Sequence, residues 1–284
     1  MSGSLVETQR VALARMEVKD IPRGATFPLK LIDRFLLQRG IIIDAGCGTG
    51  ENVRLNNAGY GVIGLDINQA ALIEAKSRGM VAFESDLTQV GFPDYFYSSL
   101  VCVELADAVL AEGLLSNLVE DQPDRFFKVA EFYLSPGGYL LIADTLQPTE
   151  DAGFLKERLS PVEAHKWVTE WEKRYRANEA LGLPYGTFVV AKPGPNKVQE
   201  WGSSEQLQAL IVSPDFERYA RHYTREEICA SATAVGLEER HFDSTIFYSR
   251  TNEPLLGCLC AFQKGEGRNL SPIERFRKMI YINT

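Results

Sequence analysis

Several features that mark particular classes of protein are absent from this chain of 284 residues. Its five cysteines are odd in number and form no Cys-x-x-Cys pair, so the sequence predicts neither a disulfide framework nor a metal site. Lys and Arg number 30 against 38 Asp and Glu, and the net charge of −8 argues against a surface that follows nucleic-acid phosphates. Residues 1–20 mix charges with short apolar stretches, which predicts neither a signal-peptide core nor a membrane span there. We therefore expect a cytoplasmic protein with no nucleic-acid partner and no membrane partner.

The apolar content is sufficient for one large folded unit. Hydrophobic residues make up 45% of the chain, and no break in composition or internal repeat divides it. A chain of this length with that apolar share can bury an α/β core and an insertion without a second independent domain. One core with an insertion is the architecture that the composition favours.

The most informative stretch is an apolar strand that runs directly into a glycine-rich turn. Residues 41–43 are isoleucines, Asp44 follows them, and glycines then occupy every second position from 46 to 50. The β-branched side chains favour a strand buried on both faces, and the glycines let the next turn pass closely beneath a ligand. A helix expected over residues 51–58 would point its free N-terminal amides toward an anionic group. The stretch predicts a nucleotide-type cofactor site.

Two more acids follow predicted strands. Residues 61–65 precede Asp66, which lies about 20 residues after Asp44, and residues 81–85 precede Asp86. Because ligands in open α/β sheets bind beyond the carboxyl ends of the strands, we expect the three acids to lie together there. A carboxylate at the second strand end can accept hydrogen bonds from both hydroxyls of a ribose.

The glycine spacing distinguishes two classes of cofactor. Dinucleotide enzymes use Gly-x-Gly-x-x-Gly, but here Glu51 occupies the place of the last glycine. The pattern that starts at Asp44 instead resembles the first motif of class I S-adenosylmethionine-dependent methyltransferases, and the Pro-Gly-Gly turn and apolar strand over 136–144 resemble that family's fifth strand. The resemblance covers about residues 30–145 and 220–264. It implies a Rossmann-like α/β fold, with a doubly wound, mostly parallel sheet and an antiparallel last strand, and S-adenosylmethionine as the cofactor.

The resemblance also implies roles for single residues. In that family the acid at the Asp44 position helps hold the methionine amino group, and backbone amides around Gly46 and Gly48 take up the carboxylate. An acid at the Asp86 position accepts from the adenine amino group. The cofactor-binding residues expected in this chain are Asp44, Gly46, Cys47, Gly48, Gly50, Asp66, Ile67, Asp86 and Leu87.

The fourth strand has two candidate positions. Residues 99–104 are the better intrinsic strand and end at Glu104, whereas residues 106–113 leave room for one ordinary helix before Pro136. The first position would need an extra helix in that gap, so we favour the second. Glu112 is then the acid at the strand end and a candidate to accept a proton from the acceptor, with Glu104 in reserve.

Three parts are expected along the chain: 1–145 as an N-terminal helix and the cofactor-binding core, 146–221 as a capping insertion, and 222–284 as the last helix, a closing hairpin and a tail. In this family such insertions often cap the methyl-donor pocket. A capping box formed by Ser160 and Glu163 starts a helix whose aromatic face either packs on the core or contacts substrate. The predicted substrate-binding residues are Tyr185, Trp201 and Asp144.

His222 is the histidine with the most suggestive position, just before a helix that a capping box at Thr224 is expected to start. A loop histidine of near-neutral pKa could take a proton from an attacking hydroxyl or amine. A surface residue with no catalytic role is equally consistent with the pattern.

These patterns together predict an enzyme that transfers a methyl group from S-adenosylmethionine to an oxygen or nitrogen of a small organic acceptor. A methyltransferase of protein or nucleic acid is the first alternative, and an inactive regulatory or scaffold protein that binds the cofactor is the second. The basic amphipathic segment 272–280 would dock on the body or on the second subunit of a homodimer, with an anionic membrane as the other option.

Overall fold

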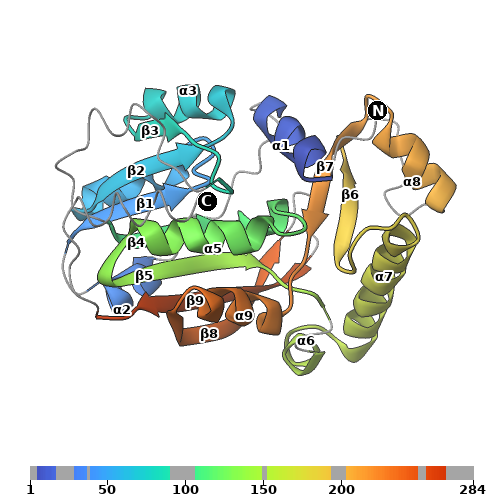
Figure 1. The fold of residues 1–284 in the computed structure, drawn as a ribbon. Coiled ribbons are helices and arrows are strands. Elements are labelled where there is room, and N and C mark those ends of the chain that lie inside the picture. Colours follow the sequence, from blue (N-terminus) through green and yellow to red (C-terminus); the bar gives the residue numbers. More distant parts are fainter. Residues whose placement is uncertain are drawn as a thin grey trace.

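A mixed sheet of seven strands forms the centre of the protein (Figure 1). The computed structural model describes residues 5–16, 29–36, 39–89, 106–148, 152–192, 203–248 and 254–266. Within them the strand order is β3-β2-β1-β4-β5-β9-β8. The strands are β1 (Ile41–Ala45), β2 (Gly61–Asp66), β3 (Val81–Glu84), β4 (Ala106–Glu112), β5 (Leu134–Thr145), β8 (Leu237–Tyr248) and β9 (Pro254–Lys264).

The strand directions confirm the predicted fold class. Strands β1 to β5 pair in parallel, whereas β9 runs antiparallel to both β5 and β8. Parallel pairing needs crossover connections, and the chain between these strands supplies helices that cover both faces of the sheet. The carboxyl ends of β1, β2, β3 and β4 consequently meet at one edge.

Alternating side chains of each strand enter two apolar clusters, one on each face of the sheet. Ile42 and Leu110 point into the cluster formed with α2 (Leu29–Phe35), the 3₁₀ helix η2 (Glu51–Ala58) and α3 (Gln69–Ser77). Ile43 and Val109 point the other way, toward α5 (Gln122–Tyr133) and α9 (Arg225–Ala234). Cys258 and Cys260 are buried in this second cluster. The result is a three-layer α/β/α core.

The fourth strand lies in the favoured register. Ile42 of β1 pairs with Ala108, and Glu112 at the end of β4 pairs with Ala143 of β5. The small and apolar side chains of β4 are almost all buried because the strand is flanked on both sides. The alternative strand at 99–104, and Glu104 with it, lies outside the described residues.

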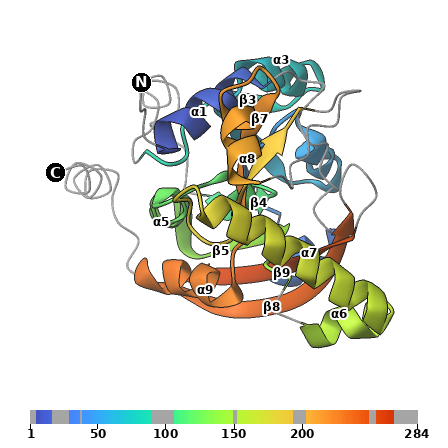
Figure 2. The ribbon, with the colours of Figure 1, turned by 90° about the vertical axis from the view of Figure 1, so that its right-hand side faces the viewer.

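The chain between β5 and α9 folds around a two-stranded antiparallel sheet of its own. β6 (Thr187–Ala191) pairs with β7 (Phe216–Arg221), α7 (Pro161–Glu179) and α8 (Ser204–Ile211) pack against β6, and α6 (Ala152–Arg158) lies at the end of α7 (Figure 2). The predicted capping box of Ser160 and Glu163 starts α7. Its aromatic face packs inward, since Trp171 and Tyr175 are buried against Phe188 of β6. Packing, rather than substrate contact, therefore accounts for that face.

The N-terminal helix α1 (Leu5–Arg15) lies beside β7, between the carboxyl edge of the main sheet and the insertion (Figures 1 and 2). Leu5 and Val6 pack against the apolar cluster of the insertion. α1 thus contacts both parts of the molecule. None of the helices among the described residues is both long and apolar enough to cross a bilayer.

The predicted capping box at the start of α9 gives a test of the local folding signals. The Thr224 hydroxyl accepts from the Glu227 backbone N–H at 3.1 Å, and the Glu227 carboxylate accepts from the Thr224 N–H at 2.8 Å. Thr224→Ala should lower the free energy of unfolding by about 1 kcal/mol. Thr233→Ala, at an exposed position of the same helix, should change it by less than about 0.5 kcal/mol. Urea denaturation of the two variants measures the difference, and equal stabilities would contradict the cap.

Candidate active site

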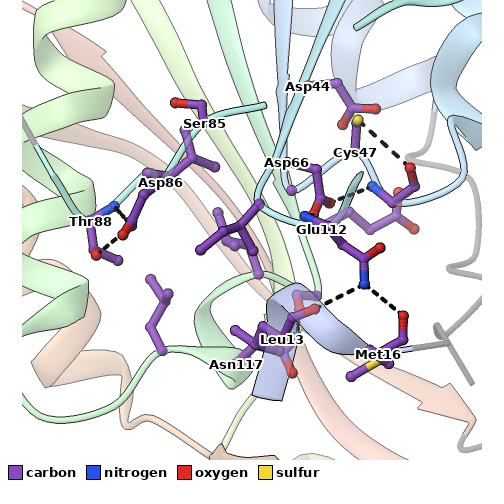
Figure 3. Close-up of a pocket in the computed structure, with 18 of the residues that line it drawn as sticks. Leu13, Met16, Asp44, Cys47, Asp66, Ser85, Asp86, Thr88, Glu112 and Asn117 are labelled. Carbon is purple, nitrogen blue, oxygen red and sulfur yellow. Dashed lines mark hydrogen bonds between the residues drawn. The ribbon is translucent and has the colours of Figure 1, made fainter. Parts of the chain in front are cut away.

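A cavity opens at the carboxyl ends of β1, β2, β3 and β4, where the sequence places its three acids (Figure 3). Three parts of the chain meet around it: these strand ends, the segment after β4, and α1. The predicted site residues that line it are Asp44, Gly46, Cys47, Gly48, Asp66, Ile67, Asp86, Leu87 and Glu112. The expected cofactor residues therefore come together at one edge of the sheet.

Asp44 is the most buried acid of the cavity, with 2% of its surface exposed. One carboxyl oxygen, Oδ1, accepts from the Asn52 side chain at 3.2 Å, but Oδ2 has no hydrogen-bond partner among the described residues. Burial raises the pKa of Asp44 to about 7, and the nearby charge of Asp66 also raises it, against the lowering effect of the Asn52 hydrogen bond. A buried carboxylate oxygen without a partner is costly, so this position suits a ligand that brings a cation or a donor.

Asp66 ends β2 and is fixed by the backbone around it. Its Oδ2 accepts from the Gly48 N–H and its Oδ1 from the Asn68 N–H, both at 2.8 Å. Burial raises the pKa of Asp66, and these amide donors oppose the rise. Each carboxylate oxygen has a second lone pair, so the group can still accept from the two hydroxyls of a ribose.

Asp86 lies across the cavity from Asp44, together with Ser85 and Thr88 (Figure 3). Its Oδ1 accepts from the Thr88 N–H at 3.0 Å and from the Thr88 hydroxyl at 2.7 Å. The Gln89 side chain donates to Oδ2 at 3.2 Å. These bonds orient the carboxylate at the rim, beside the buried side chain of Leu87.

The glycine turn differs from its expected role in one respect. The N–H groups of Gly46 and Cys47 both donate to the Leu65 carbonyl, at 2.8 and 3.0 Å, and the Gly48 N–H donates to Asp66. These amides are engaged within the protein, so they are not free to take up a ligand carboxylate as the sequence suggested. The turn instead ties the end of β1 to the end of β2. The helix after it has the expected bounds but is a 3₁₀ helix.

Gly50 is required for packing rather than for contact with the cavity. Its φ is +82°, a region that favours glycine, and a Cβ there would lie 2.9 Å from the Cα of Ala75 in α3. The backbone of the turn therefore approaches the helix more closely than a side chain would permit. Gly50 does not line the cavity, although the sequence placed it among the cofactor contacts.

Glu112 and Asp44 share one amide donor. The Asn52 side-chain nitrogen donates to Asp44 at 3.2 Å and to Glu112 Oε2 at 3.4 Å. One amide group therefore links the acid at the end of β1 to the acid at the end of β4. Asn52 is buried and lines the cavity, yet no motif in the sequence marks it.

Residues of α1 complete the cavity on the side opposite the strand ends. Arg10, Leu13 and Met16 line it, and the carbonyls of Leu13 and Met16 accept from the Asn68 side chain at 2.9 and 2.8 Å. Figure 3 shows Leu13 and Met16 below the acids. Sequence reasoning predicted a helix here without assigning it to the site, since its residues form no recognisable motif.

His222 is not in the cavity. Its ring lies 4.6 Å from the Trp171 ring and 4.9 Å from the Phe188 ring, and its Nδ1 is 2.7 Å from the Tyr175 hydroxyl. Burial, with the Arg174 charge adding to it, lowers the pKa of His222 to about 3, so the ring is neutral at physiological pH. A neutral ring enclosed by aromatic side chains cannot reach an acceptor in the cavity. We therefore withdraw His222 as a candidate base.

The three predicted substrate contacts have different outcomes. Tyr185 packs on Tyr175 with ring centroids 5.3 Å apart and does not line the cavity. Asp144 is also outside the lining, since its carboxylate accepts from the backbone of Ser116 at 3.2 Å and of Thr145 at 2.7 Å. Burial raises the pKa of Asp144 to about 6, and those donors oppose the rise. Both side chains therefore make contacts within the protein and do not face the cavity. Trp201 lies outside the described residues.

Fold and site together define an α/β protein whose strand ends surround a cavity lined by acids, with the residues expected for an adenosyl-type cofactor. A family described as "Methyltransferase domain" matches residues 43–142, the segment that carries this edge. An uncharacterized methyltransferase of Emericella nidulans is 29% identical over 192 residues, which are 61% of this chain and 65% of that protein. Residues 43–142 therefore carry a methyltransferase domain, similar to those of class I S-adenosylmethionine-dependent methyltransferases, for which S-adenosylmethionine is the cofactor.

Two further similarities have narrower scope. A tRNA (carboxymethyluridine(34)-5-O)-methyltransferase of Arabidopsis thaliana is 26% identical over 132 residues, 46% of this chain but only 30% of that protein. The solved structure of a SAM-dependent methyltransferase from Methanosarcina mazei superposes with a TM-score of 0.61 at 21% identity, covering 85% of this chain and 99% of that one. At this level of identity, the similarity to the Methanosarcina structure shows a shared fold and nothing further. The chain matches less than two thirds of the length of either sequence relative.

The residues present fit this cofactor. The unpartnered Oδ2 of Asp44 would accept from the methionine ammonium group, and its burial makes a cationic partner favourable. Asp66 keeps lone pairs for the ribose hydroxyls, and Ile67 and Leu87 supply apolar surface for the adenine. The cofactor supplies an activated methyl group on its sulfonium.

Asp44 should make cofactor binding depend on pH. Its raised pKa means that the folded, cofactor-free protein keeps a proton that the unfolded chain releases between about pH 4 and 7, so stability falls as the pH rises through that window. Asp44→Asn lacks this loss and should have the higher melting temperature at pH 8. Calorimetry should show that wild-type affinity for S-adenosylhomocysteine rises between pH 5.5 and 7, whereas the variant binds weakly and with little pH dependence. A pH-independent wild-type affinity would contradict the assignment.

The second expectation separates structure from catalysis at His222. His222→Ala leaves the Tyr175 hydroxyl without its partner and opens a cavity among aromatic rings, which should lower the free energy of unfolding by about 2–4 kcal/mol. Affinity for S-adenosylhomocysteine, measured below the melting temperature, should stay within about twofold. His165→Ala, at an exposed position of α7, is the matched control and should change neither quantity. A stable variant with normal binding would contradict the buried role.

Proposed function

We propose that the protein transfers the methyl group of S-adenosylmethionine to an oxygen or nitrogen of a small organic acceptor. The observation that supports this most is the charge of the cavity. Among the described residues that line it, five carry carboxyl groups, whereas Arg10 is the one with a basic side chain, and its guanidinium pairs with Glu7 at 2.9 Å. A site lined by acids repels polyanions and favours neutral or cationic acceptors.

An RNA acceptor is the second candidate because the Arabidopsis relative is named as a tRNA methyltransferase. Nucleic-acid binding draws most of its affinity from Lys and Arg that displace counterions from phosphates. The net charge of −8 and the acidic cavity oppose such an interaction. A small acceptor is therefore the better supported of the two.

Two groups of residues would serve the reaction. Leu13 of α1 and Met16 directly after it, with Leu114 and Leu118 after β4, line the cavity with apolar surface that excludes water from a reactive methyl donor. Glu112 is the carboxylate at the end of β4 and would accept the proton that an O–H or N–H acceptor releases as its lone pair takes the methyl group. Asn52 orients Glu112 through their hydrogen bond. Orientation of the acceptor supplies the rest of the acceleration.

A methyl-transfer assay with radiolabelled S-adenosylmethionine tests the choice of acceptor. The purified protein is given a cell extract divided into a low-molecular-mass fraction, a protein fraction and total tRNA. Label should enter the low-molecular-mass fraction, and the product then identifies the acceptor atom. Label found in tRNA alone would overturn the proposal and favour the second candidate. No label in any fraction, with the cofactor bound, would favour the inactive regulatory protein.

Glu112→Gln tests the proton acceptor once an acceptor is in hand. Loss of a general base lowers turnover by about 10² to 10⁴, and the amide keeps the size of the side chain. Affinity for S-adenosylhomocysteine should change by less than about tenfold. Glu226→Gln removes the same charge from an exposed position of α9 and should leave turnover unchanged. Near-normal turnover in Glu112→Gln would mean that methyl transfer needs no base from this residue.

A further inference from the structure

α1 contains one polar side chain that is completely removed from solvent. Gln9 has 0% exposed surface and is the buried residue of a helix whose other positions are exposed or half-buried. A buried primary amide costs free energy unless its two donors and its oxygen find partners. The partners of Gln9 come from two other parts of the molecule.

The Gln9 amide bonds to the backbone of β7 as a neighbouring strand would. Its Nε2 donates to the Tyr219 carbonyl at 2.8 Å, and its Oε1 accepts from the Tyr219 N–H at 2.8 Å. This exchange of two bonds with one residue is the pattern that an adjacent strand makes in an antiparallel sheet. The second hydrogen of Nε2 goes to the Asn117 carbonyl at 2.6 Å. One side chain therefore joins α1, the insertion and the segment after β4.

The contact at Asn117 reaches the cofactor cavity. Asn117 lines the cavity, and its side chain donates to the Gly113 carbonyl at 2.6 Å and accepts from Arg218 Nε at 2.8 Å. Arg218 belongs to β7, so the insertion holds this residue both directly and through Gln9. A shift of β7 would move a wall of the cavity.

We propose that Gln9 is a positioning residue that couples the closure of α1 over the cofactor to the placement of the insertion. Leu13 of α1 and Met16 directly after the helix cover the cavity, and a cofactor that contacts them stabilises α1 in this position. Because Gln9 bonds to β7 only when α1 is so placed, the cofactor also stabilises β7. Coupling of this kind is reciprocal: an altered β7 contact must change how the cofactor is held. The inference needs the bound cofactor and does not depend on which acceptor is methylated.

S-adenosylhomocysteine is the probe for the first test, which needs no variant. Hydrogen exchange followed by mass spectrometry compares the wild-type protein with and without saturating ligand. Peptides that contain β7 should exchange at least about threefold more slowly with ligand, although β7 does not line the cavity. Unchanged exchange in β7, with slowed exchange in the glycine turn, would overturn the inference.

Two substitutions test the residue itself. Gln9→Leu keeps the size of the side chain but removes all three hydrogen bonds. Gln9→Glu keeps an acceptor for the Tyr219 N–H, but in its ionised form it cannot donate to either carbonyl. Both should release S-adenosylhomocysteine about 10- to 100-fold faster in stopped-flow displacement, as expected for the loss of two or three buried bonds. In both, exchange in β7 should no longer respond to the ligand. A merely structural role would not remove that response.

Gln208→Leu, at an exposed position of α8, is the matched control and should behave as the wild-type protein. Gln9→Leu with a wild-type dissociation rate and a normal response of β7 would overturn the inference. If neither Gln9 variant folds, the wild-type exchange comparison decides. A wild-type protein that does not bind S-adenosylhomocysteine would contradict the cofactor assignment. It would then overturn this inference as well, because the inference needs the bound cofactor.

Discussion

The structure depends on carboxylates held away from water at one edge of the sheet. Asp44 and Asp66 end neighbouring parallel strands, and burial raises the pKa of both. Backbone donors from the turn after β1 and the turn after β2 bond to Asp66, whereas one oxygen of Asp44 has no partner within the part of the chain that the structure describes. A buried carboxylate of this kind is costly by itself, and a cationic ligand that pairs with it would stabilise the folded protein. The most buried acid of the cavity therefore keeps one oxygen that a ligand can bond to.

The positions of the acids at the strand ends could be predicted from the sequence. A strand that ends in an acid, a glycine turn and a second acid one βαβ step later form a local pattern, because backbone geometry dictates the spacing. The position of β4 followed from the length that remained before Pro136. These features are local or follow from chain length, and the structure has the predicted strands at each of them, with bounds within two residues of those expected.

The features that the sequence did not reveal depend on contacts between distant residues. Gln9 and Tyr219 are 210 positions apart, and nothing in the neighbourhood of either one indicates the other. His222 precedes a capping box, a position that suggests an open loop, but the aromatic residues of α7 and β6 enclose it. The same aromatic residues were candidates for substrate contact and prove to be the insertion's own core. Tertiary packing decided these outcomes.

Asn68 shows how few residues can occupy some positions of this edge. Its Oδ1 accepts from the Ala71 N–H at the start of α3, its N–H donates to Asp66, and its Nδ2 donates to two carbonyls of α1. Aspartate caps helices about as well as asparagine, but it has no donor for α1 and would add a negative charge beside Asp66. Serine would cap α3 without reaching the helix above. Of the common capping residues, asparagine alone can begin α3 and hold α1 over the cofactor, so this position is chemically restricted although no catalytic role falls to it.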